Sequence, residues 1–126
     1  SAAILDSLVA CKFVNIAVAE EYLARALTSL TGISYPTGEL IRAGERIWNL
    51  ERLYNLREGF SRADDTLPPR LLSEPATGAS AGWVSHLEPM LAEYYRGRGW
   101  DENGVPKLAK LEELKLAELA VEVLHG

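Results

Sequence analysis

The sequence predicts an all-α fold, an irregular helical domain of about five to six helices with a long proline-containing loop. Three observations lead to this prediction. Apolar residues recur at three- and four-residue spacing in several segments, which is the period of a helix that buries one face. No run alternates apolar and polar residues convincingly for more than about four residues, so strands are not indicated. Glycine and proline gather between the periodic segments, where they mark turns.

The first half of the chain is predicted to hold three helices. Residues 2–14 are mostly apolar and contain no helix breaker, which favours a short buried helix. Residues 16–30 show the helical spacing clearly and are followed by Gly32, a candidate C-cap. Residues 39–57 contain no proline and follow Thr37, a typical N-cap residue. They should form the longest helix.

The second half is predicted to begin with irregular structure. Residues 61–70 contain two adjacent prolines among turn formers and should be a loop, and residues 73–82 have the small, polar composition of a flexible segment. A helix follows, with Pro89 in its first turn, and Gly97 and Gly99 are expected to end it. A final pair of helical segments is predicted over residues 107–124.

Length and composition point to a single helical domain over residues 1–126. The net charge of -5 argues against a nucleic-acid partner. Apolar stretches fall short of the roughly 20 residues that a membrane-spanning helix requires, so no membrane segment is expected. The single cysteine fits a reducing compartment, and the cytoplasm is expected. The chain begins without Met, as if cut from something longer.

Without a family in view, the residues offer few candidates for chemistry. Asp64 and Asp65 have the chemistry to seat a cation or act as a base, but adjacent acids after a helix are usually solvated or cap a helix. A lone cysteine in an apolar run, such as Cys11, is most often a small buried hydrophobe, yet distant thiolates also combine to hold iron–sulfur clusters. Several aromatic residues suit core or interface anchors better than a cofactor box: Trp48, Tyr54, Trp83, Tyr94, Tyr95 and Trp100.

A family resemblance extends over essentially the whole chain. Residues 6–13 read Asp-Ser-Leu-Val-Ala-Cys-Lys-Phe and resemble the D-x-x-G-L-C motif of the aldehyde:ferredoxin oxidoreductase family. The match continues through Gly-Glu-Arg-Ile-Trp-Asn-Leu-Glu-Arg at residues 44–52. Residues 54–60, 62–70 and 94–101 resemble the remaining signatures of that family's C-terminal helical region, in the family's order.

The resemblance implies a C-terminal piece of an enzyme that oxidises aldehydes to carboxylic acids and passes electrons to ferredoxin. Its metal is tungsten, or molybdenum, held by two pyranopterin dithiolenes beside a four-iron four-sulfur cluster. By the same resemblance Cys11 is the fourth cluster ligand, and a C-x-x-C-x-x-x-C run elsewhere in the enzyme supplies the other three. Asp6 would accept hydrogen bonds from a pterin, and Lys12 would lie against it, chiefly through its backbone.

The chain also departs from the family's pattern. Val9 and Ala10 stand where the family usually has Gly-Leu, and a side chain at a glycine position can prevent close approach of the backbone to a cofactor. The N-terminal pterin-binding domain and the three-cysteine segment are not among these 126 residues. No catalytic residue is therefore expected here, and the isolated chain should hold no cofactor and be inactive.

Three readings of function follow. In the first, the chain closes the cofactor site of the enzyme and supplies one cluster ligand, with the rest of the enzyme, ferredoxin and an aldehyde as partners. It should then expose an apolar face around Leu5, Leu8, Cys11 and Phe13, through which it can also pair with itself. In the second, it is a stand-alone helical subunit or interaction module that has lost redox function, with a polar surface there. The third, a cofactorless enzyme built on the paired aspartates and nearby arginines, rests on charge alone.

Overall fold

The computed structural model describes residues 1–125, with the backbone alone described at residues 15, 124 and 125. Over this range the chain is all α, as predicted, and its one β-type pairing is an isolated bridge between Trp100 and Pro106. In chain order the helices are α1 (Ala2–Ser7), α2 (Val14–Ala17), α3 (Glu20–Thr31), α4 (Thr37–Arg57), the 3-10 helix η1 (Arg62–Asp64), α5 (Pro69–Ser73), the 3-10 helix η2 (Gly78–Ser80), α6 (Leu87–Arg98), α7 (Leu108–Glu113) and α8 (Ala117–His125).

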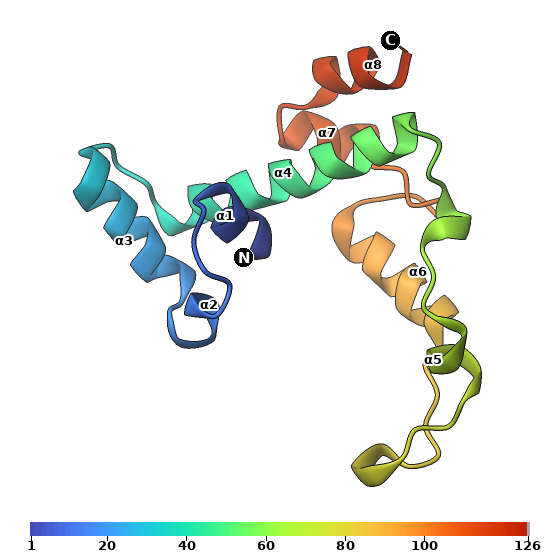
Figure 1. Ribbon diagram of the computed structural model, residues 1–126. Coiled ribbons are helices and arrows are strands. Elements are labelled where there is room, and N and C mark those ends of the chain that lie inside the picture. Colours follow the sequence, from blue (N-terminus) through green and yellow to red (C-terminus); the bar gives the residue numbers. More distant parts are fainter. Residues whose placement is uncertain (126) are drawn as a thin grey trace.

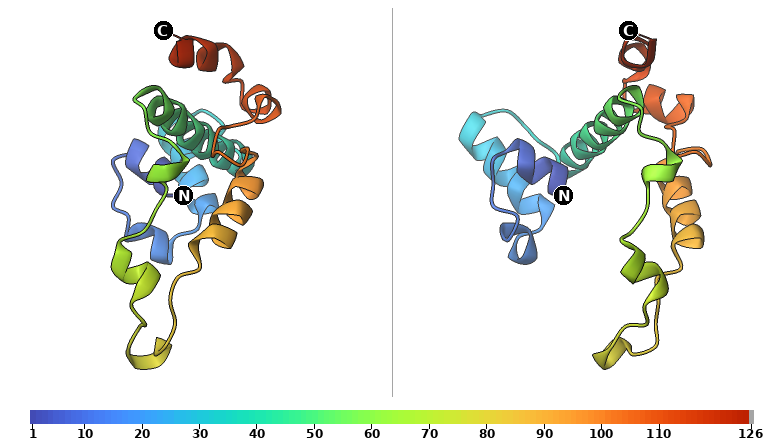
Figure 2. Two further views of the ribbon diagram at one scale, coloured as in Figure 1. Left: turned by 90° about the vertical axis from the view of Figure 1, so that its right-hand side faces the viewer. Right: turned by 45° about the vertical axis from the view of Figure 1, so that its right-hand side comes forward.

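Helix α4 is the element around which the others pack. Its 21 residues contain no proline, and it begins at Thr37, directly after Pro36. Helices α1, α3 and α8 all contact it. Figure 1 shows α1–α3 and, separately, α6 with the segment before it projecting from one side of α4, whereas α7 and α8 lie on the other side; the turned views in Figure 2 agree. The molecule is thus an open arrangement on one long helix.

Two small apolar clusters hold the helices together. One joins the C-terminal half of α4 to α7 and α8 and consists of Leu53, Leu111, Leu114, Leu116 and Ala120. The other joins α1 and α3 to the N-terminal half of α4 and consists of Ile4, Ala24 and Leu40, with Leu23 and Leu27 partly buried beside them. Since neither cluster includes a residue of α5 or α6, these elements depend on other contacts for their position.

The structure has more helices than the sequence predicted, and the first two predicted helices are shorter than expected, whereas α4 begins two residues earlier. The expected helix over residues 16–30 begins only at Glu20, because Val18 and Ala19 have extended backbones and because two glutamates in the first turn favour a start there. It ends at Thr31 with Gly32 in the left-handed conformation, as predicted. The helix predicted over residues 2–14 ends at Ser7, and the next helix begins only at Val14, for a reason that concerns the candidate site.

In the second half the helices follow the prediction, but the segments predicted to be irregular, residues 61–70 and 73–82, contain short helical turns. The predicted loop over residues 61–70 holds η1 and the start of α5, whose first residue is Pro69, a position that suits proline. Helix α6 carries Pro89 in its first turn and has Gly99 as its C-cap, as predicted, but it continues through Gly97, which was also expected to end it. Residues 107–124 fall into α7 and α8 as expected. Within the described part of the chain, no helix has the length and apolar character needed to cross a membrane.

The close approach of α1 to α4 depends on Gly44, and we expect Gly44→Ala to lower the free energy of unfolding by about 1 kcal/mol. An added Cβ would lie 2.7 Å from Cγ1 of the buried Ile4, and the overpacking outweighs the gain in helix propensity. Gly38→Ala in the same helix is the matched control, because nothing lies within 4 Å of its added Cβ. Urea unfolding of the two variants is the measurement, and a stabilising Gly44→Ala would contradict the packing described.

Candidate functional site

The end of α1 sets the geometry of the segment that carries Asp6, Cys11 and Lys12. The Ala10 amide donates to the Leu5 carbonyl at 2.9 Å and the Val9 amide donates to the Asp6 carbonyl at 3.2 Å, which is the hydrogen-bond pattern of a Schellman C-cap. Val9 occupies the left-handed position of this motif with φ 54°. This backbone turns the chain away from the helix axis. The prediction of one continuous helix over residues 2–14 was therefore wrong.

The three predicted site residues all lie at the surface. Asp6 is the penultimate residue of α1, whereas Cys11 and Lys12 belong to the connection between α1 and α2. All three side chains are exposed, and the Cys11 thiol is free. The expectation of a buried cysteine, which a lone cysteine in an apolar run suggests, is therefore wrong. An exposed thiol is available to a metal ion outside this part of the chain.

The segment is fixed from behind by buried side chains. Ile4 and Leu5 are almost completely buried, and Ile4 packs on Gly44 of α4. The prediction that Leu5 belongs to an exposed apolar face is wrong, because this residue faces inward on α1. Leu8 is 39% exposed and Phe13 is 78% exposed, so these two apolar side chains, which flank Cys11 in the sequence, are exposed as predicted.

We expect Val9→Gly to raise the free energy of unfolding by about 1 kcal/mol. A left-handed backbone costs an L-residue roughly 1–2 kcal/mol, and this cost exceeds the extra chain entropy that glycine loses on folding. Little burial is lost, because the Val9 side chain is 94% exposed. Val9→Ala is the control and should gain much less, since alanine keeps its Cβ at the same positive φ. Equal stabilisation by both variants, measured by urea unfolding, would refute the strain argument.

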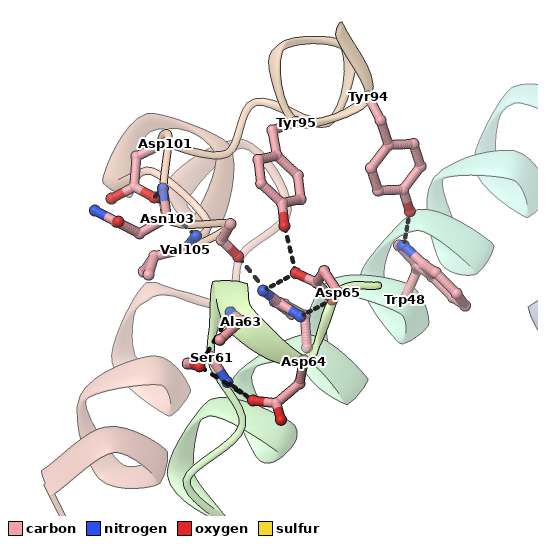
Figure 3. Close-up of polar contacts among 12 residues, drawn as sticks. Trp48, Ser61, Ala63, Asp64, Asp65, Tyr94, Tyr95, Asp101, Asn103 and Val105 are labelled. Atoms are coloured by element: carbon pink, nitrogen blue, oxygen red, sulfur yellow. Dashed lines mark hydrogen bonds and ion pairs between the residues drawn. The ribbon is translucent and has the colours of Figure 1, made fainter. Parts of the chain in front are cut away.

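A second polar cluster lies at the C-terminal half of α4 and joins α4, η1 and α6 (Figure 3). Arg52 donates through both terminal nitrogens to the carboxylate of Asp65, at 2.9 and 2.7 Å, and its Nε donates to the Gly104 carbonyl at 2.8 Å. The Tyr95 hydroxyl donates to the same carboxylate. A Cβ at Gly104, whose φ is +73°, would collide with the Arg52 guanidinium, so only glycine presents its carbonyl here.

These contacts shift two pKa values in opposite directions. Burial alone would raise the pKa of Asp65, but hydrogen bonds from Arg52 and Tyr95 outweigh it and hold that pKa below its ordinary value. Burial, together with the hydrogen bond to the Asp65 carboxylate, raises the pKa of Tyr95 to about 12. Asp65 therefore stays charged and Tyr95 stays protonated across the neutral range.

The Tyr95 pKa predicts a loss of stability in alkali. Since the folded pKa of about 12 exceeds the ordinary value of 10.0, the contribution is fully present below pH 10 and is lost as the pH rises toward 12. The loss should be roughly 2 kcal/mol, and Tyr95→Phe should abolish it. Urea unfolding at pH 9 and pH 11.5 measures the difference. Tyr22→Phe, at an exposed tyrosine, is the control; the idea fails if Tyr95→Phe retains the wild-type loss.

The buried neighbours of this cluster are fully satisfied. The Trp100 indole nitrogen donates to Oδ1 of the fully buried Asn49 at 2.8 Å, and the Arg52 guanidinium stacks over the Trp100 ring at 5.2 Å. Among the described side chains, no buried nitrogen or oxygen lacks a hydrogen-bond partner. A hollow of about 400 Å³ lies beside the cluster, between α4 and α6, with Trp48 and Tyr94 on its wall. The contacts of this cluster are those of a structural joint.

The paired aspartates take structural positions. Asp64 accepts from the Ser61 amide at 2.7 Å and completes a capping box at η1, which is the helix-capping role that the sequence favoured. Asp65 holds Arg52, a contact that the sequence did not predict. The signal was present, because Asn49, Arg52 and Leu53 follow each other at the three- and four-residue spacing of the buried face of α4.

The predicted aromatic anchors divide into two groups. Tyr95 and Trp100 are buried and belong to the structural joint, as core residues. Tyr54 and Trp83 are more than half exposed, and Trp48 and Tyr94 are partly exposed and hydrogen-bonded to each other at 2.7 Å.

Comparison with known proteins finds relatives along nearly the whole chain. It is 42% identical to the tungsten-containing aldehyde ferredoxin oxidoreductase of Pyrococcus furiosus over 118 residues, which is 92% of this chain and 20% of that protein. The enzyme of the same name from Thermococcus kodakarensis is 40% identical over the same shares. An aliphatic sulfonate oxidoreductase, WOR-like subunit, from Pyrococcus furiosus is 34% identical over 96% of this chain and 21% of that protein. The chain spans about a fifth of the length of these curated relatives.

A solved structure shares the fold. The active site complex BamBC of benzoyl coenzyme A reductase, in complex with 1,5-dienoyl-CoA, matches with a TM-score of 0.66 and 26% identity, over 83% of this chain and 15% of that chain. The family model for aldehyde ferredoxin oxidoreductase, domains 2 and 3, matches residues 1–116. With nearly the whole chain matched in this way, the protein belongs to the aldehyde ferredoxin oxidoreductase family.

Proposed function

We propose that this chain closes the cofactor site of a tungsten (or molybdenum) pterin enzyme that oxidises aldehydes to carboxylic acids with ferredoxin as acceptor, and that Cys11 supplies one ligand to its iron–sulfur cluster. The observation that carries the proposal is the free, exposed Cys11 thiol, five positions after an exposed Asp6, in a chain of this family. The reaction class comes from the relatives, which are named as tungsten-containing aldehyde ferredoxin oxidoreductases.

The one cysteine of this chain can supply one of the four ligands of an iron–sulfur cluster. A four-iron cluster needs four protein ligands, usually thiolates, and this sequence has a single cysteine. Among the side chains that the structure describes, no three from His, Cys, Asp or Glu come close enough together to hold a metal ion. Cys11 would therefore be one of four ligands, with three from elsewhere in the polypeptide. The chain alone should be inactive for this reason.

Asp6 and Lys12 would face the pterin from the same segment. The Asp6 carboxylate is a hydrogen-bond acceptor, which suits the N–H-rich edge of a pterin, and Lys12 would contact the group through its backbone. The bound metal–pterin group would supply the two-electron redox chemistry. The buried Ile4 and Leu5 support this role, because they fix α1 against α4 and give the exposed segment a rigid base.

The alternative, a stand-alone subunit or interaction module without redox function, requires a polar surface around Cys11. The exposure of Leu8, Val9 and Phe13 instead favours a segment that packs against further protein. Val9 and Ala10 are the departures from the family pattern that argue against the pterin contact. The Val9 side chain points into solvent, and its backbone has the left-handed conformation that suits glycine.

The test is Cys11→Ser in a hybrid enzyme, which we define as the Pyrococcus furiosus relative with this chain in place of its 118 matching residues. We expect the hybrid enzyme to bind iron and acid-labile sulfide and to give the electron paramagnetic resonance signal of a reduced cluster, and Cys11→Ser to lose most of both. Ser7→Ala, at an exposed residue of α1, is the control. Unchanged iron content and an unchanged signal in Cys11→Ser would refute the ligand assignment.

The isolated chain offers a complementary test. Reconstitution of residues 1–126 with iron and sulfide should give no stable stoichiometric cluster, because three ligands are missing. A monomer that forms one would contradict the claim that the site is completed by another part of the polypeptide.

A further inference from the structure

The segment between α4 and α6 forms a projecting arm, which we define as residues 66–86. It leaves η1, passes through α5 and η2 at its far end, and returns to the start of α6 (Figure 1). Its two limbs are joined by backbone hydrogen bonds, from Ser85 to Leu71 and from Ala76 to Trp83, each 2.9 Å long. The two limbs of the arm therefore lie against each other at these two points.

The arm has no core of its own. None of its residues is buried, and the same holds for every residue from 54 to 94. Large apolar side chains lie in solvent along this stretch: Trp83 is 71% exposed, Met90 is 58% exposed and Leu71 is 41% exposed. Ordering a backbone costs roughly 1–2 kcal/mol per residue, and burial of apolar surface is the main term that offsets it. A few cross-limb hydrogen bonds do not replace that burial.

The joint of Arg52, Asp65 and Tyr95 holds only the base of the arm. Asp65 immediately precedes it, and the Arg62–Glu88 ion pair at 2.6 Å spans its two ends. Beyond these contacts the arm projects from the side of α4 that also carries α1–α3, as both figures of the whole chain show. One further body of protein on that side can contact the arm and the connection that carries Cys11.

We propose that the arm is an intramolecular docking surface, which becomes stably ordered when it packs against the part of the polypeptide outside residues 1–126, with Trp83 as its anchor. The partner of the arm is inferred from the length of the relatives. This chain spans about a fifth of its curated relatives, and the family model that matches residues 1–116 includes the whole arm. An exposed indole is the kind of side chain that anchors interfaces. The inference rests on family membership, and it is independent of the assignment of Cys11 as a cluster ligand.

Hydrogen exchange followed by mass spectrometry tests the proposal. In the isolated chain, amides of the arm should exchange within about tenfold of the rate of an unfolded peptide, whereas those of α4 and α7 are protected. In the hybrid enzyme, the arm amides should exchange at least about 100-fold more slowly than in the isolated chain. Trp83→Ser should reverse much of that protection. Val121→Ser, at an exposed residue of α8 on the other side of α4, should leave it unchanged.

Three results would overturn the proposal. Arm amides that are already protected in the monomeric isolated chain would mean that the arm orders itself. Protection that rises with protein concentration would assign the surface to a second copy. Arm amides that stay unprotected in a folded hybrid enzyme would mean that the rest of the polypeptide does not pack against the arm.

Two further measurements keep the test decisive. If the hybrid enzyme does not fold, the isolated chain is mixed with the remaining part of the relative. The emission of Trp83, taken as the difference from Trp83→Phe, should then shift to shorter wavelength, and no shift would contradict the proposal. Cys11→Ser in the hybrid enzyme should lose iron while the arm stays protected, which separates this inference from the cluster assignment.

Discussion

Replacing Arg52 with methionine should lower the free energy of unfolding by about 3 kcal/mol, because the change leaves the Asp65 carboxylate and the Gly104 carbonyl without their main donor. The side chain of Arg52 is 8% exposed and that of Asp65 is 25% exposed, so water replaces the lost contacts only in part. Tyr95 would remain as a donor to Asp65. Urea unfolding at pH 7 measures the effect.

Arg57→Met is the matched control, because Arg57 lies in the same helix and makes an ion pair with Glu58 in which both side chains are more than 40% exposed. Such a pair contributes roughly 0–1 kcal/mol. Asp65→Asn combined with Arg52→Met should cost less than the sum of the single changes, since each removes the same contact. If Arg52→Met proves no worse than Arg57→Met, the joint between α4 and α6 does not hold as described.

The second large effect is expected at Leu53, where truncation to alanine should cost about 3 kcal/mol. Leu53 is fully buried and packs with Leu111, Leu114, Leu116 and Ala120, so its loss leaves a cavity between α4, α7 and α8. Leu50→Ala in the same helix is the control, because Leu50 is 37% exposed and should cost much less. Similar losses for the two variants, measured by thermal and urea unfolding, would mean that α7 and α8 do not pack on α4 through Leu53.

The elements that the sequence predicted well are those whose signals are local. Helix α4 follows from 21 residues without proline, and α6 follows from a proline in its first turn and a glycine at its end. The break after α1 has no such signal, because Val9 is a residue that rarely adopts a left-handed backbone. The family's glycine at this position was interpreted as a sign of close approach to a cofactor, whereas the backbone of Val9 has the left-handed conformation that glycine adopts readily.

In the candidate site, too, local features could be predicted from the sequence and long-range contacts could not. The motif that contains Asp6, Cys11 and Lys12 could be located from the sequence, but the exposure of Cys11 could not, because apolar neighbours suggested burial. The joint of Arg52, Asp65 and Tyr95 depends on contacts between residues 13 and 30 positions apart, which no local pattern encodes. Polar residues on the buried face of a helix are the one sign of such a joint that a sequence offers.

The most direct test of the central claim is a crystal structure of the hybrid enzyme with anomalous data collected at the iron absorption edge. We predict that the Cys11 sulfur is bonded to an iron atom of a four-iron cluster whose other three ligands come from outside residues 1–126. An intact cluster with four protein ligands that do not include Cys11, or a Cys11 thiol that faces solvent beside it, would contradict the account.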